Sequence, residues 1–154
     1  MIRLQTEPFE PGGLLAGFTC AHVGSGAVAS FTGLCRAESH GEAVEALELD
    51  CYPPLAEPTI SGFAQEATAR FDLDGVLVLH RHGRILPGEA IVFVAAAAPH
   101  RRAAFEAVDF LMDRLKTGAP FWKKEHGPAG ARWVEPRGQD YTDAARWIRQ
   151  EASE

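Results

Sequence analysis

Nothing in this sequence limits the possible folds more than Ala90–Ala98, AIVFVAAAA, in which nine consecutive residues are apolar. The run is far shorter than the roughly 18 residues needed to cross a bilayer. It has the length and composition of a strand that is covered on both faces of a sheet. Val76–His80, VLVLH, has the same character. We therefore expect two buried strands, and the small side chains of the first allow a helix to pack closely against it.

A helical pattern follows the longer apolar run. Apolar residues recur at spacings of three and four, at Ala104, Val108, Leu111 and Leu115. This spacing predicts a helix with one buried stripe. Gly118 and Pro120 are expected to end it, because both residues disfavour continuation of a helix.

The remaining elements are predicted from the same kinds of pattern. Helices are expected from about Glu57–Ile60 to Phe71, with Pro58 in the first turn, and over Tyr141–Glu151. Strands are expected at Met1–Gln5, Ala27–Gly33, Val44–Tyr52 and Ala131–Glu135. Loops are expected at Glu7–Gly13, Leu34–Gly41, Arg81–Glu89 and His126–Gly130. Leu14–Val23 fits either a short helix or a strand.

The order of these elements indicates the fold class. We expect Ala27–Gly33 and Val44–Tyr52 to form an antiparallel pair whose connecting loop carries Arg36. Strands mixed with a few helices indicate an α+β protein, with helices packed on a mixed or antiparallel sheet. A chain of 154 residues is long enough to bury a core and predicts one domain spanning residues 1–154.

Charge and cysteine content exclude several functions. The net charge of −6 argues against a nucleic-acid-binding surface, which needs a basic excess. Three cysteines without CxxC spacing suit a reducing compartment rather than a disulfide framework. The N-terminal stretch lacks the apolar core of a signal peptide, and no run is long enough for a membrane span. We therefore expect a cytoplasmic protein that does not bind membranes.

Cationic side chains cluster where the longer apolar run meets the helix. His100, Arg101 and Arg102 stand at the helix start, where free N–H groups favour an anion. Arg36 follows another strand, and guanidinium groups bind phosphate through two parallel hydrogen bonds. The alternative is that these arginines are only solvated surface charges.

Two lysines flank the predicted helix end. Lys116 lies in its last turn and Lys123 follows the apolar segment Phe121-Trp122, so both amines can face one pocket. A lysine held against apolar surface loses hydration, and its pKa falls toward a range useful for proton transfer. The alternative is that Lys116 complements the helix dipole and Lys123 is solvated.

Two other patterns, a histidine pair and a cysteine, each have a simpler explanation. His80-x-His82 places two imidazoles on one side of a strand, but no acidic or thiol ligand completes a metal site, so none is predicted. Cys35 stands beside Arg36, whose charge would lower the pKa of the thiol and suit it to carry sulfur. Inert packing is the commoner role for such a cysteine.

Five segments together carry a resemblance to a known family. They are FTGLCR (Phe31–Arg36), HRHGRILPGEAIVFVAAAA (His80–Ala98), PHRRAAF (Pro99–Phe105), KTGAPFWKKE (Lys116–Glu125) and RWVE (Arg132–Glu135). In this order they resemble the large, catalytic subunit of molybdopterin synthase, and the likeness spans Phe31–Trp147. The resemblance implies an α/β hammerhead-like fold.

The resemblance also implies an activity and an assembly. A small ubiquitin-like sulfur-carrier subunit would insert its thiocarboxylated C-terminus, and the sulfur would pass to cyclic pyranopterin monophosphate. This reaction forms the dithiolene of molybdopterin in molybdenum cofactor biosynthesis, and it needs no cofactor. The family works as a homodimer within a heterotetramer. The small subunit is expected to be a separate chain.

Site residues follow from the same resemblance. Lys116 and Lys123 match the two lysines on which family catalysis depends, as general acid or base, as charge stabilisers or through a transient imine. The positions that match or adjoin the substrate site are Leu34, Cys35, Arg36, His100, Arg101, Lys124 and Glu125. Arg137 is hypothesised to reach a neighbouring subunit's pocket.

Two rival functions come from other classes. A non-catalytic docking module for a ubiquitin-like tail would use Phe121-Trp122 as its anchor and would not need Lys123 for sulfur transfer. A phosphate-binding hydrolase would turn over without any protein partner.

Overall fold

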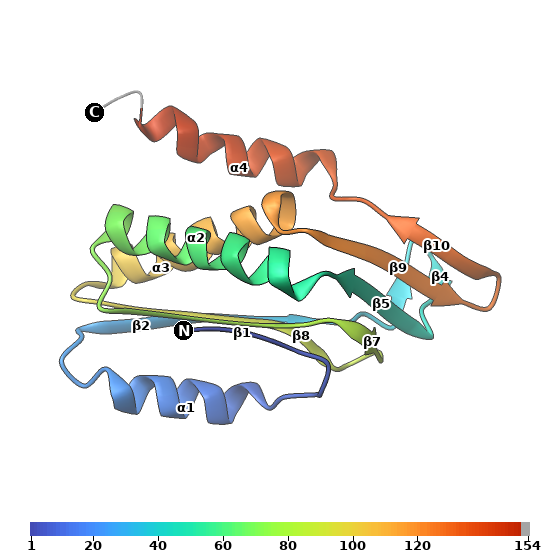
Figure 1. Cartoon of the computed structure of the whole chain (residues 1–154), viewed down its shortest axis with the longest axis horizontal. Helices are drawn as coiled ribbons and strands as arrows, with labels where there is room; N and C mark the ends of the chain where they lie inside the picture. Colours follow the sequence, from blue (N-terminus) through green and yellow to red (C-terminus); the bar gives the residue numbers. More distant parts are fainter. Residues whose placement is uncertain (152–154) are drawn as a thin grey trace.

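The computed structural model describes residues 1–151 and contains two four-stranded sheets (Figure 1). The first sheet has the strand order β1-β6-β8-β2, in which β1 runs parallel to β6 and the other pairs are antiparallel. Its strands are β1 (Ile2–Gln5), β2 (Ala27–Leu34), β6 (Gly75–Arg81) and β8 (Ala90–Ala98). The two strands predicted to be buried, β6 and β8, form the centre of this sheet, as their apolar composition requires.

Helices cover both faces of the first sheet (Figure 1). They are α1 (Pro11–Ala21), α2 (Pro53–Phe71), α3 (Arg101–Gly118) and α4 (Gly138–Glu151). On one face, Phe18 of α1 packs against Phe93 of β8. On the other face lie α2 and α3, and α4 packs over them through Trp147. The alanines of β8 leave room for helices on both sides, so this prediction is confirmed.

The second sheet is antiparallel, with the order β10-β9-β5-β7. Its strands are β5 (Ala46–Cys51), β7 (Gly83–Ile85), β9 (Phe121–Gly127) and β10 (Gly130–Val134). A short hairpin, β3 (Glu38–Ser39) and β4 (Glu42–Ala43), lies beside it. Leu47, Leu49, Ile85 and Cys35 form a small core under this sheet. The sheet extends beyond the ends of α2 and α3 (Figure 1).

The predicted α+β class is confirmed, but the predicted pairing of Ala27–Gly33 with Val44–Tyr52 is wrong. β2 pairs with β8 in the first sheet, whereas β5 pairs with β7 and β9 in the second. The physical reason is that the alternating leucines of β5 pack with Cys35 and Ile85 in a separate core. Within residues 1–151, no helix has both the length and the apolar composition that a membrane span requires.

Several boundaries also differ from the predictions. α1 begins at Pro11, inside the predicted Glu7–Gly13 loop, because the Glu10 carboxylate accepts hydrogen bonds from the first helical N–H groups. α2 begins at Pro53, so Pro58 lies inside the helix and removes only one backbone hydrogen bond. The predicted Arg81–Glu89 loop contains β7, and β9 was not predicted as a strand.

Candidate functional site

Two lysines predicted for the site lie where α3 ends and β9 begins. Lys116 is exposed in the last turn of α3, and the side chain of Lys123, near the start of β9, is 36% exposed. Burial lowers the pKa of Lys123, and the positive charges of Lys116 and Arg36 lower it further. Charges act on a pKa mainly at short range. The structure therefore brings Lys116, Lys123 and Arg36 together, and we call these three residues the cationic cluster.

Glu125 balances the charge of the cationic cluster. Its Oε1 lies 3.9 Å from Lys123 Nζ, and its Oε2 lies 3.0 Å from Nη2 of Arg132. Burial acts to raise the pKa of Glu125, but hydrogen bonds from Arg132 and Ser39 and the charge of Lys123 outweigh it, so the pKa is lowered. The ionised carboxylate in turn acts to raise the pKa of Lys123. The net lowering at Lys123 thus means that burial and like charge exceed this attraction.

Lys124 points to the opposite face of β9, since side chains alternate along a strand. Its Nζ lies 5.2 Å from the centre of the Trp133 ring, which stands directly across the β9–β10 pair. This is a cation–π contact at a partly exposed site. Lys124 is therefore separated from the Lys123 face within one chain, although the sequence places the two residues side by side.

The segment Leu34-Cys35-Arg36 leaves the end of β2 with three different environments. Leu34 is 56% exposed and Arg36 is exposed, whereas Cys35 is buried in the small core. Burial raises the pKa of the Cys35 thiol. This environment favours packing as the role of Cys35 over the alternative of a sulfur carrier activated by Arg36. Packing, the commoner role, is what the structure shows.

His100 and Arg101 lie at the start of α3, at the opposite end of the helix from Lys116. A helix rises about 1.5 Å per residue, so Arg101 and Lys116 are roughly 22 Å apart along the axis. The sheet agrees, because β2 begins opposite Ala98 and ends opposite Ala90. Arg36 follows the second of these ends and His100 the first. The expectation that His100, Arg101 and Arg36 form one anion site is thus wrong within a single chain.

Arg137 lies in the exposed turn between β10 and α4. Its backbone N–H donates to Asp140 Oδ2 at 2.8 Å, and its guanidinium lies 3.8 Å from Oδ1 of the same carboxylate. The side chain is 74% exposed, so it is free to be recruited by another molecule.

Sequence reasoning missed the role of His80. Its ring is buried and stacks on Phe121, with ring centroids 4.1 Å apart. Nδ1 lies 2.8 Å from the Arg81 carbonyl oxygen and donates to it. Burial lowers the pKa of His80 to about 4, and the nearby charge of Lys116 acts in the same direction. This neutral imidazole packs against Phe121, the first residue of β9. The signal available in the sequence was a histidine in an otherwise apolar strand.

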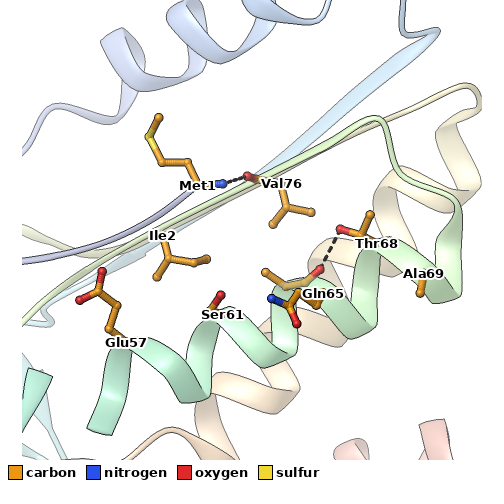
Figure 2. Close-up of a pocket in the computed structure, with 9 residues that line it drawn as sticks. Met1, Ile2, Glu57, Ser61, Gln65, Thr68, Ala69 and Val76 are labelled. Carbon is orange, nitrogen blue, oxygen red and sulfur yellow. Dashed lines mark hydrogen bonds between the residues drawn. The ribbon is translucent and has the colours of Figure 1, made fainter. Parts of the chain in front are cut away.

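The largest remaining features are the titratable side chains outside the cluster and a surface groove. In the part of the chain that the structure describes, there is no group of three His, Cys, Asp or Glu residues placed to hold a metal ion. A groove of about 600 Å³ lies between β1 and α2 and is lined by Ile2, Glu57, Ser61 and Gln65 among others (Figure 2). None of the described residues that line this groove was predicted to belong to the functional site.

Fold and cluster together define a class of protein. It is an α+β protein in which an amine of lowered pKa stands beside a second amine and a guanidinium at the junction of two sheets. Such a site attracts anionic groups, stabilises negative charge that develops during group transfer, and exchanges protons more readily than an ordinary amine.

Comparison with known proteins makes this class specific. Residues 4–118 match the family model described as MoaE protein. The molybdopterin synthase catalytic subunit of Caulobacter vibrioides is 56% identical over 96% of this chain and 97% of its own length. The solved MoaE protein of Burkholderia ambifaria is 42% identical, with a TM-score of 0.81 over 96% of this chain and 97% of that one. Molybdopterin synthase from Staphylococcus aureus is 30% identical, with a TM-score of 0.78 over 86% and 95%. The chain belongs to the MoaE family.

Proposed function

We propose that this protein is the catalytic subunit of a molybdopterin synthase. It transfers sulfur from the thiocarboxylated C-terminus of a small ubiquitin-like subunit to cyclic pyranopterin monophosphate. The observation that carries this proposal is the desolvated amine of Lys123 beside Lys116 and Arg36, in a member of the MoaE family. The names of the curated relatives, which call them catalytic subunits, support the existence of a partner subunit.

The reaction sets three tasks for the site. The substrate phosphate must be held, and we assign this to Arg36, which presents its guanidinium in the cationic cluster. The sulfur must form a bond to a pterin carbon, and water must then cleave its bond to the acyl carbon of the small subunit. We assign proton transfer in these steps to Lys123, because its lowered pKa makes the neutral amine more accessible. Lys116 stabilises the oxyanion that forms as the acyl carbon is attacked.

We propose that a second copy of the chain completes the substrate site. His100 and Arg101 are roughly 22 Å from Lys116 along α3. A two-fold axis perpendicular to α3 would nevertheless place the start of α3 in one copy beside the end of α3 in the other. Arg101, Phe105, Met112 and Lys116 lie on one side of α3, since they are spaced by four, seven and four residues. Phe105 is 66% exposed in the middle of this stripe.

The surroundings of α3 support this arrangement. Arg114 pairs with Glu66 of α2 on one side, and Arg146 of α4 contacts Asp109 on another. Neither ion pair uses a residue of the stripe that contains Phe105, and α3 also packs against β2, an edge strand of the first sheet. A homodimer formed there, with one small subunit for each catalytic subunit, gives the expected heterotetramer. Arg137 and the face of β9 that carries Lys124 are further candidates for contact with bound substrate or a neighbouring subunit.

Two coarser features complete the proposal. We place the protein in the cytoplasm, which is supported by three cysteines that are all free within the described residues. We also propose that residues 1–154 work as one domain, which is supported by relatives that align over 95% or more of the chain.

Reconstitution with thiocarboxylated small subunit and cyclic pyranopterin monophosphate tests the function. We expect wild type to form molybdopterin, Lys123→Ala to lose about 10²-fold or more in rate, and Lys116→Ala to be similarly impaired. Arg3→Ala, which removes an exposed cation from β1, serves as the control. Full sulfur transfer by Lys123→Ala would favour the docking-module rival. Turnover of phosphorylated substrates without the small subunit would favour the hydrolase.

A further inference from the structure

Arg81 is a buried charge that the proposed reaction does not use. Its side chain is only 3% exposed, and a buried guanidinium is costly unless its donors are satisfied. Nη1 donates to Glu89 Oε2 at 2.8 Å. Nε and Nη2 donate to the Thr6 carbonyl oxygen, and Nη2 also donates to the Arg84 carbonyl oxygen. One residue therefore ties together the end of β1, strand β7 and the turn that follows β7.

Glu89 also fixes the turn that follows β7, through hydrogen bonds to the Leu86 backbone. Its Oε2 accepts the Leu86 N–H at 2.9 Å, and its own N–H donates to the Leu86 carbonyl oxygen at 3.1 Å. Pro87 and Gly88 occupy the two central positions, and Gly88 has φ of +86°. This is the geometry of a type II turn, which favours proline followed by glycine. The Leu86 N–H and Arg81 lower the pKa of the Glu89 carboxyl, so the carboxylate is ionised as the pair requires.

The turn holds the residue next to Arg36. The Cys35 N–H donates to the Glu89 carbonyl oxygen at 2.9 Å, and the Gly88 N–H donates to the Cys35 carbonyl oxygen at 2.8 Å. Cys35 is therefore fixed on both sides of its backbone just before the chain presents Arg36 to the cationic cluster. The buried Cys35 side chain adds a third attachment in the small core.

We infer that the Arg81–Glu89 pair positions Arg36 for substrate binding. This inference rests on the proposed role of Arg36 in holding the substrate phosphate. Neither Arg81 nor Glu89 touches the reacting atoms; both act through the backbone of Cys35. The pair therefore governs the affinity for the phosphorylated pterin, whereas the sulfur-transfer step depends on Lys116 and Lys123.

A double-mutant cycle tests this inference. Glu89→Gln keeps the shape and an acceptor but removes the charge, and KM for cyclic pyranopterin monophosphate is measured with saturating thiocarboxylated small subunit. We expect KM to rise about tenfold and kcat to change by less than about twofold. In the Arg36→Ala background the same substitution should change KM by less than about twofold, because Glu89 affects substrate binding only through the Arg36 side chain. Glu66→Gln, which breaks a remote ion pair with Arg114, is the matched control.

The outcomes separate this inference from the function. If Arg36→Ala leaves KM unchanged, the assigned role of Arg36 is wrong. If Arg36→Ala raises KM but Glu89→Gln does not, only the positioning role is overturned. The same holds if Glu89→Gln raises KM by the same factor in the wild-type and Arg36→Ala backgrounds. Should Glu89→Gln fail to fold in thermal melts, Gly88→Ala decides. It strains the turn at a positive φ while the space around it is open, and the same rise in KM is expected.

Discussion

A site shared between two copies predicts an unusual pattern of complementation in mixed dimers. One chain carries Lys123→Ala, and its partner carries His100→Ala with Arg101→Ala. If each pocket takes Lys123 from one copy and Arg101 from the other, one pocket of the mixed dimer contains every lesion. The other pocket contains none.

The expected magnitudes follow from the geometry. Hydrogen bonds to charged groups contribute about 1.5–3 kcal/mol each, so each parent homodimer should lose about ten- to a hundredfold or more in kcat/KM. The mixed dimer should retain half of the wild-type activity per dimer. The separation of roughly 22 Å along α3 exceeds the reach of the two side chains, which is why a single chain does not suffice.

The assay uses two affinity tags on co-expressed chains, so that only mixed dimers are purified, and measures molybdopterin formation with thiocarboxylated small subunit. A mixed dimer as inactive as its parents would refute the shared site, because both of its pockets would then be damaged within their own chains. A mixture of the two parent homodimers, purified separately, is the control for subunit exchange.

Three further outcomes are expected. Phe105→Glu should convert the protein to a monomer in sedimentation velocity that keeps the wild-type circular dichroism spectrum, since Phe105 is 66% exposed in the single chain; a dimer of Phe105→Glu would exclude this surface. His80 has a folded pKa of about 4 against 6.5 when unfolded, so the unfolded state alone takes up a proton as pH falls through this window. Wild type should therefore lose up to about 3 kcal/mol of stability from this group between pH 6.5 and 4, and urea titrations of His80→Gln should lack that loss. Trp147→Ala should cost about 3–5 kcal/mol in the same titrations, because Trp147 is 4% exposed, donates to Asp113 and packs edge-on against Phe71 and Phe110; a cost below 1 kcal/mol would mean that α4 is not docked as described.

Local patterns in the sequence were sufficient for the central elements. β8 was predicted with its observed bounds, because nine apolar residues between polar turns allow little else. The end of α3 was predicted from Gly118 and Pro120, and the helix does end at Gly118. These predictions rest on residues whose local conformational preference is enough to define the element.

Pairing between distant segments could not be predicted in this way. The alternation in β5 is real, but it fits any partner strand that covers the same face. β9 was missed because Lys123 and Glu125, on its inward face, read as solvent-exposed, whereas they form ion pairs at the cluster. Its register against β5 depends on contacts with residues that are 70 or more positions away in the sequence.

The site shows the same division. The proximity of Lys116 and Lys123 follows from their separation of seven residues across one break in the helix. His100 and Arg101 stand at the start of α3 and Lys116 stands in its last turn. The length of the helix therefore separates residues that the sequence pattern suggested would share one site. The Arg81–Glu89 pair spans a single predicted loop, but no sequence pattern connects this loop to Arg36. That relation emerges only from the backbone hydrogen bonds of Cys35.

The most direct test of the central claim is a titration of the Lys123 amine by NMR in protein labelled at lysine ε-carbons. The chain has only three lysines, Lys116, Lys123 and Lys124, so the signals are readily assigned by substitution. We predict that the pKa of Lys123 lies below the ordinary value of 10.5 and rises when Lys116 is replaced by Met. A Lys123 amine that titrates at its ordinary value and does not respond to Lys116→Met would contradict the account.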